Sequence, residues 1–199
     1  MATLQPVPRE ATPPMTQTRA DAWALVTEFV QSDSLRKHML AVEGSMRYYA
    51  ELLGQDVEYW GIAGLIHDFD YERHPTLDEH VWVGSRILAE RGWPAELIRT
   101  VQSHADYMNV PREKLIDHAL FACDELSGFV TAVAYVRPNH SLAEVESRSV
   151  IKKMKDKAFA RAVNREDMIK GAEEMGLPLE EHVANIIAAL QRIAPELGL

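Results

Sequence analysis

Apolar residues recur along most of the chain at the spacing of one buried helix face. No segment alternates between apolar and polar residues with period two, and proline and glycine fall between the apolar stretches. The pattern predicts an all-α fold, a compact irregular bundle of helices. We expect the helices at residues 18–31, 34–54, 57–71, 77–91, 94–106, 113–136, 142–154, 165–175 and 179–193.

The chain before Thr16 differs from the rest in composition. Residues 1–15 hold four of the ten prolines and almost no apolar periodicity, so we expect a flexible Pro-rich leader. The remaining residues, 16–199, are enough for a single domain that buries roughly 70% of its unfolded surface. Such a domain needs neither disulfides nor a structural metal for its stability.

The composition also indicates the cellular compartment of the protein. No apolar run reaches the roughly 18 residues of a membrane span, and prolines interrupt the N-terminal segment where a signal peptide would be apolar. The single cysteine, Cys123, allows no intrachain disulfide, and its apolar neighbours predict a small buried side chain. We expect a cytoplasmic protein that does not associate with membranes.

The formal net charge of −9 counts against binding to long nucleic acids. Basic residues nevertheless gather in one stretch, which we call the basic island, where Asp156 is the single acid among Arg148, Lys152, Lys153, Lys155, Lys157, Arg161 and Arg165. A solvated helix face explains such a run. Attraction of an anionic substrate also explains it, and the candidate contacts are then Lys153, Lys157 and Arg161.

Histidine and aspartate interrupt apolar helix faces in the first half of the chain. His38 falls on an apolar stripe where another leucine is expected, although a hydrogen-bonded core histidine would fit there too. The His67-Asp68 doublet directly follows an apolar run, and Gly61 and Gly64 share a face with Asp68, so a neighbouring helix can approach closely. Burying Asp68 unpaired would cost several kcal/mol. We expect it to meet a cation, and a metal ion would serve.

Three further residues share helix faces with apolar neighbours in the same way. The complete set of candidate metal ligands is His38, His67, Asp68, His80, His104 and Asp124. Imidazole and carboxylate groups together suit zinc, iron or manganese, and six of them exceed what one tetrahedral zinc site uses. Two divalent ions fit this set better than one.

The order His38, His67-Asp68, Asp124 resembles the HD superfamily of metal-dependent phosphohydrolases, which is named for its His-Asp doublet. Residues 64–72, 124–129 and 137–160 are further similar to small bacterial single-domain HD hydrolases, so the resemblance covers nearly everything after Thr16. It implies an all-α domain with His38, His67, Asp68 and Asp124 at a first metal and Asp68 as the bridging ligand. His80 and His104 fall where two-metal members place their extra histidines.

The resemblance implies hydrolysis of a phosphate ester by a metal-activated water. The expected substrate is a small anionic phosphorylated molecule or a nucleotide. Cyclic dinucleotides fit poorly, because the chain lacks the Gly-Tyr-Pro signature of members that cleave them, and His104 is followed by Ala105-Asp106 rather than that subgroup's His-Glu. Asp68 would act at the metals, while Asp70 or Asp106 would orient a ligand histidine or move a proton.

Two other functions stay open at this point. Some HD relatives hold two irons with the same ligands and act as oxygenases. A module that senses a nucleotide without turnover would also keep this scaffold. For the remaining histidines, we expect His74 and His118 to be structural or exposed, and His140 and His182 to lie at the surface.

Overall fold

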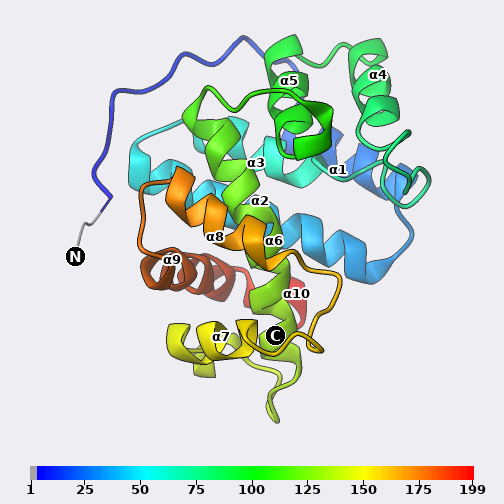
Figure 1. Cartoon of the computed structure of the whole chain (residues 1–199). Coiled ribbons are helices and arrows are strands. Elements are labelled where there is room, and N and C mark those ends of the chain that lie inside the picture. The colour runs from blue at the N-terminus through cyan, green and yellow to red at the C-terminus, as the bar shows by residue number, and fades with distance from the viewer. Residues whose placement is uncertain (1–3) are drawn as a thin grey trace.

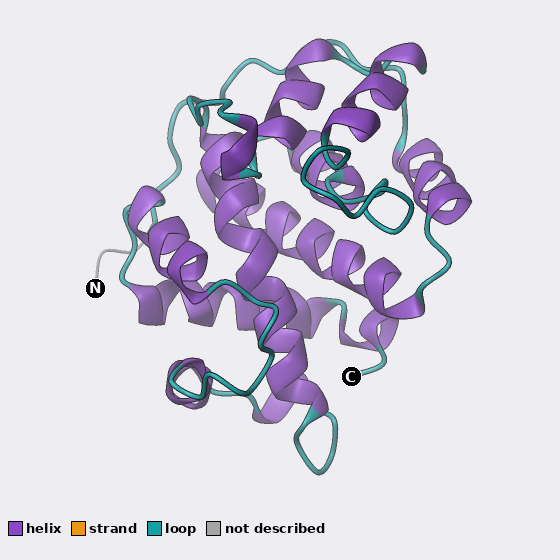
Figure 2. Ribbon diagram, turned by 45° about the vertical axis from the view of Figure 1, so that its right-hand side comes forward, coloured by secondary structure: helices purple, strands orange, loops and turns teal. Residues whose placement is uncertain are grey.

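The computed structural model describes residues 4–199, which form helices joined by turns and loops without any strand (Figures 1 and 2). The predicted all-α fold is confirmed. None of the helices in this range combines the length and apolar composition that a membrane crossing requires. In chain order the helices are α1 (Arg19–Phe29), α2 (Asp33–Leu53), α3 (Val57–Ile66), α4 (Trp82–Glu90), α5 (Ala95–Ser103), the 3₁₀ turn η1 (Asp106–Met108), α6 (Leu115–Tyr135), the 3₁₀ turn η2 (Leu142–Glu144), α7 (Ser147–Met154), α8 (Arg165–Glu174), α9 (Leu179–Arg192) and α10 (Ala194–Leu197).

Helices α2 and α6 cross at the centre of the molecule, and α3 packs along α2 (Figure 1). At the crossing, the buried hydroxyls of Ser45 and Ser127 share a hydrogen bond of 2.8 Å. Gly64 allows the close approach of α3, because a Cβ at this position would lie 3.0 Å from the Val42 carbonyl oxygen and 2.9 Å from Met46 Cγ. These three helices form the framework that carries most of the histidine and aspartate residues singled out above.

Two helices have an end that lies five residues inside the range that the apolar pattern predicts, and both differences lie near Asp70. The pattern predicts a helix over 57–71, but α3 ends at Ile66; it predicts another over 77–91, but α4 begins at Trp82. The Asp70 carboxylate accepts a hydrogen bond of 2.8 Å from the amide of Gly84 in the first turn of α4. This contact between distant residues satisfies an amide that has no partner within its own helix. The chain between α3 and α4 forms turns.

The C-terminal half differs in smaller ways. The helix expected over 142–154 is divided into η2 and α7, because the chain is extended at Val145 and Glu146 between them. The helix expected over 179–193 is α9, and the short α10 follows it.

Residues 4–15 form no helix but lie against the domain. The amide of Val7 donates to the Leu53 carbonyl oxygen over 3.2 Å, and the amide of Glu10 donates to Gln55 Oε1 over 2.8 Å. Glu10 also accepts a hydrogen bond from the amide of Leu115 at the start of α6. Residues 1–3 of the expected leader lie outside the described residues. The flexibility of the leader and the domain boundary at Thr16 stay predictions.

His182 on α9 is buried, so the prediction that it lies at the surface is wrong. Its Nδ1 accepts a hydrogen bond from the Tyr49 hydroxyl, and its Nε2 donates to the Ala122 carbonyl oxygen over 2.9 Å. The ring is therefore neutral, and burial lowers the pKa of His182 to about 4. His182 precedes buried Ile186 by one helical turn, which is the sequence signal for burial.

Replacing His182 with glutamine is expected to reduce the loss of stability in mild acid. The unfolded chain binds a proton at this residue near pH 6.5, whereas the folded protein does so near pH 4. The stability supplied by the neutral ring is complete above pH 6.5 and is lost as the pH falls towards 4. Between pH 7 and pH 5 this linkage amounts to about 2 kcal/mol.

Urea unfolding of the wild type and His182→Gln at pH 7 and pH 5 measures this contribution. The variant should lose less stability than the wild type over the interval. Equal losses in the two proteins would contradict the assignment.

Candidate metal centre

Four imidazoles and two carboxylates converge from separate segments of the chain. His38 lies on α2, His67 and Asp68 directly follow α3, His80 precedes α4, His104 follows α5 and Asp124 lies on α6. The ring centroids of the neighbouring histidine pairs lie 5.2–5.7 Å apart. The structure thus brings together all six residues that the sequence singled out as candidate ligands.

Asp68 lies between two halves of this cluster. Its Oδ2 lies 3.6 Å from His67 Nε2 and 4.0 Å from His38 Nε2. Its Oδ1 lies 3.1 Å from His80 Nε2 and 3.5 Å from His104 Nε2. Because each oxygen faces a different pair of histidines, the carboxylate has the geometry of a bridge between two cation positions.

Asp124 belongs to the half that contains His38 and His67. Its Oδ1 lies 3.0 Å from His38 Nε2 and 3.3 Å from His67 Nε2. The first half of the cluster is therefore richer in donors than the second, in which the bridging Asp68 is the one carboxylate that faces both histidine Nε2 atoms.

Hydrogen bonds on the outer side of three rings fix which nitrogen faces the carboxylates. His67 and His104 each place Nδ1 against a backbone carbonyl oxygen of the preceding turn, and His80 Nδ1 lies 2.9 Å from Asp70 Oδ1. Since these oxygens accept hydrogen bonds, each Nδ1 donates and each Nε2 is directed into the cluster. Histidines that ligate metals are oriented in the same way.

His67 provides the clearest indication that the cluster fits a metal ion. Its Nε2 is fully buried, and the nearest carboxylate oxygen lies 3.3 Å away without forming a hydrogen bond. A buried polar atom left without a partner costs about 1–3 kcal/mol. Imidazole nitrogen and carboxylate oxygen are donors that zinc, iron and manganese accept. The residues present therefore fit divalent metal.

The electrostatics of the cluster favour positive charge. Burial opposes protonation of His67, but the carboxylates of Asp68 and Asp124 outweigh it and raise its pKa to about 9. Burial likewise opposes protonation of His80, and hydrogen bonds to Asp68 and Asp70 raise its pKa to about 9. Burial also disfavours ionised carboxylates, yet the facing imidazoles hold the pKa of Asp68 and Asp124 well below the ordinary range. A divalent cation can replace the protons that this field stabilises.

Asp70 supports the second half of the cluster from behind. It is buried and accepts hydrogen bonds from His80 Nδ1 over 2.9 Å and from the Gly84 amide over 2.8 Å. Position 84 leaves no room for a side chain, because a Cβ would lie 2.7 Å from Asp70 Cγ. Of the two roles considered for Asp70, the geometry supports the orientation of a ligand histidine.

The geometry supports neither of the roles considered for Asp106. Its carboxylate forms ion pairs with Arg112 at 2.7 Å and Lys170 at 2.6 Å, and no histidine of the cluster contacts it. Burial opposes the ionisation of Asp106, but its hydrogen bonds from Lys170 and Arg112 outweigh that effect and lower its pKa. It lines the cavity as a paired anion and is poorly suited to accept a proton.

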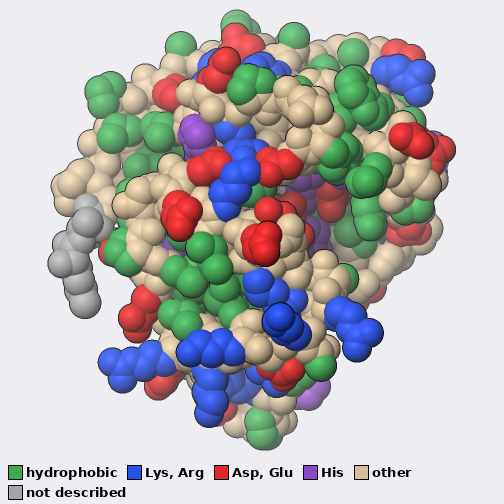
Figure 3. All heavy atoms as spheres, in the orientation of Figure 1, with side chains coloured by type: hydrophobic (Ala, Val, Ile, Leu, Met, Phe, Trp, Pro, Cys, Tyr) green, Lys and Arg blue, Asp and Glu red, His purple; other side chains and the backbone are tan. Residues whose placement is uncertain are grey.

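A cavity of about 690 Å³ opens beside the cluster. Figure 3 shows histidine side chains inside a hollow right of the centre, with carboxylates at its edge. Five of the six candidate ligands line this cavity, and His67 lies behind them. The volume is within the range of small-molecule sites, which is roughly 300–1,000 Å³.

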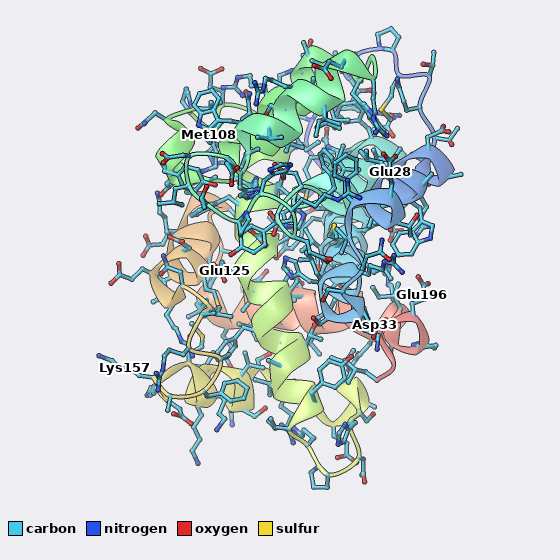
Figure 4. The ribbon with its side chains drawn as sticks, turned by 90° about the vertical axis from the view of Figure 1, so that its right-hand side faces the viewer. Glu28, Asp33, Met108, Glu125, Lys157 and Glu196 are labelled. Carbon is cyan, nitrogen blue, oxygen red and sulfur yellow. The ribbon has the colours of Figure 1, made fainter. Side chains whose placement is uncertain are left out.

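The structure does not bring the candidate phosphate contacts of the basic island into this cavity. The lining includes backbone and side chains of the α7–α8 loop at Ala162, Val163 and Asn164, but not Lys153, Lys157 or Arg161. Lys153 is bound to Asp156 at 2.9 Å, and Figure 4 shows Lys157 at the outer edge of the molecule, away from Glu125. Since none of the three side chains lines the cavity, the solvated-surface interpretation fits them better.

Comparison with known proteins shows which family these residues belong to. The HD domain family matches residues 35–129, a range that contains all six candidate ligands. The chain contains an HD domain. No curated protein and no solved structure matches the chain. HD domains form a superfamily of metal-dependent hydrolases and bind divalent metal ions.

Residues other than the candidate ligands complete the cavity, and the sequence did not single them out. The Tyr107 hydroxyl donates to the His80 carbonyl oxygen over 3.1 Å. Burial and the neighbouring Asp124 raise the pKa of Glu125 to about 8, and burial together with Asp106 raises the pKa of Asp167. The available signal was the position of Glu125 next to a candidate ligand. Asp167 could not be found, because the approach of α8 to α6 depends on tertiary packing.

Asp70→Asn in this HD domain is expected to weaken metal binding by about 10–100-fold, the usual effect of losing a carboxylate that supports a ligand histidine. An amide that donates to His80 Nδ1 would put the proton on Nε2 and remove the lone pair from the cluster. Chelator competition, followed by elemental analysis, measures the change.

Asp78→Asn is the matched control, because Asp78 is exposed in the same loop and lies outside the cavity lining. It should bind metal as the wild type does. Equal metal affinity in Asp70→Asn and Asp78→Asn would rule out the supporting role of Asp70.

Proposed function

We propose that the protein is a metal-dependent phosphohydrolase that cleaves a phosphate ester of a small molecule or nucleotide. The observation that carries this proposal is the bridging position of Asp68 at the inner wall of an open cavity. Divalent ions bound there would lower the pKa of a bound water towards neutrality and neutralise phosphoryl oxygens.

The residues of the chain have separate tasks in this proposal. His38, His67 and Asp124 would hold one cation and His80 and His104 the other, while Asp68 would set the spacing between them. Asp70 would keep His80 in the ligating tautomer. The attacking group would be a water that the cations activate. Neither serine nor cysteine is among the described residues that line the cavity, and the hydroxyl of Thr76, which does line it, donates to Glu79.

Cys123 offers no alternative nucleophile. It is fully buried, and burial together with the neighbouring Asp124 raises the pKa of its thiol well above the ordinary value. Since the thiolate is the reactive form, this side chain is expected to be inert.

Asp68→Ala is expected to abolish hydrolysis and to lower the metal content. The variant lacks the carboxylate that faces both histidine pairs, so its activity should fall by more than about 100-fold, beyond the loss typical of a residue that only supports a ligand. The measurement is a panel of phosphomonoesters and nucleotides with manganese-, zinc- or iron-loaded protein, together with elemental analysis. Asp78→Ala serves as the control and should keep full activity.

Retention of activity and full metal occupancy by Asp68→Ala would contradict the proposal. Oxygen uptake by iron-loaded wild type, without phosphate release from any ester, would instead indicate the oxygenase considered above. Nucleotide binding without turnover by fully metal-loaded protein would indicate a sensing module.

A further inference from the structure

Apart from the candidate ligands, the described residues of the cavity wall include acidic side chains but no lysine or arginine. Asp106, Glu125 and Asp167 line it, whereas no lysine or arginine is among the described lining residues. Arg112 and Lys170 bind Asp106 and so neutralise it. Apart from the candidate ligands, the acidic groups that face the cavity without a basic partner are therefore Glu125 and Asp167.

Asn164 holds these two carboxylates together between α6 and α8. Its Nδ2 donates to Asp167 Oδ2 over 2.6 Å, and its backbone amide bonds to the Glu125 carboxylate. Neither acid forms an ion pair with a described lysine or arginine. The closest basic groups, Arg112 and Lys170, are engaged by other acids. A ligand can therefore supply the positive charge that this wall lacks.

The balance of charge limits how many phosphates the cavity can hold. Two divalent ions would bring four positive charges against two negative charges from Asp68 and Asp124. The net positive charge that remains is about enough to balance one phosphate dianion. Sites for polyphosphates add lysine or arginine for the further phosphates. Here a second phosphate would meet Glu125 and Asp167.

Aromatic side chains complete the same cavity. Tyr71 and Tyr107 line it and are 44% and 37% exposed, so their rings remain accessible to a ligand. Aromatic faces attract ammonium groups, and the effect adds to that of nearby carboxylates. Both features favour a cation over an anion in the part of the cavity that lies outside the metal centre.

We infer that the substrate is a phosphomonoester with a single phosphate at the metal centre and an ammonium group that binds Glu125 and Asp167. This inference rests on the proposed function, which puts the phosphate at the metal centre. The source of specificity is then not the basic island but the acidic wall, which we define as Glu125 and Asp167. This wall selects the organic part of the substrate by its charge.

Three phosphonates of similar length test the inference by binding alone. They are 3-aminopropylphosphonate, butylphosphonate and 3-phosphonopropionate, which end in an ammonium group, a methyl group and a carboxylate. Calorimetry with metal-loaded protein should give the tightest binding for the first and the weakest for the last, with about tenfold between successive compounds. The phosphonate bond is not hydrolysed, so turnover is not needed.

Glu125→Gln combined with Asp167→Asn replaces both carboxyl groups with amides while keeping the shape of the wall. The range of affinities for the three compounds should then shrink to within about threefold. Glu166→Gln is the matched control: Glu166 is exposed on the same helix and outside the cavity lining, so its removal should leave the order unchanged. Metal content and circular dichroism verify that each variant is loaded and folded.

The outcomes separate this inference from the proposed function. Similar binding of all three phosphonates to the wild type, or an unchanged order of affinity in the double variant, would overturn the acidic-wall inference and leave a phosphate site at the metals. Absence of binding by all three would overturn both. If the ammonium compound binds best but no ester is hydrolysed, the wall is confirmed and the hydrolase proposal fails.

Discussion

The rest of the site depends on the Asp68 carboxylate, which lies between helices with only 16% of its side chain exposed. An ionised group in such a place costs several kcal/mol unless positive charge and hydrogen bonds compensate it. The fold meets this demand by directing four histidine rings at Asp68 and Asp124 from separate segments. The close contact of α3 with α2 at Gly64 lies just before the His67-Asp68 doublet. Packing and site geometry are thus set by the same few residues.

A second layer of polar contacts links the site to the ends of helices. Asp70 accepts hydrogen bonds from the amide in the first turn of α4 and from His80, so the start of that helix and the orientation of the ring are fixed together. Arg112 has a similar position on the other side, where it binds the Ser103 carbonyl oxygen just before His104, as well as Asp106 and Glu174. A substitution that breaks either contact would therefore displace His80 or His104, in the second half of the cluster, before it affects the first half.

The sequence allowed the all-α fold and the set of candidate ligands to be predicted, because histidine and aspartate on apolar helix faces need an explanation. His182 shows the limit of that argument. It has the same apolar setting as His38, yet Tyr49 and a backbone carbonyl satisfy it. Contacts such as those of Asp70 with Gly84 and of Asn164 with Glu125 could not be predicted, because helix packing decides which surfaces meet. The basic-island residues Lys153, Lys157 and Arg161 do not line the cavity, since charge along a sequence does not say which way side chains point.

Anomalous diffraction from crystals of the manganese- or zinc-loaded protein tests the bridging role of Asp68 most directly. The structure predicts two anomalous peaks roughly 3.5–4 Å apart, one bound by His38, His67 and Asp124 and the other by His80 and His104, with an Asp68 oxygen on each. A single peak in the first half would contradict the bridge. Absence of any peak among these six residues would contradict the metal centre itself.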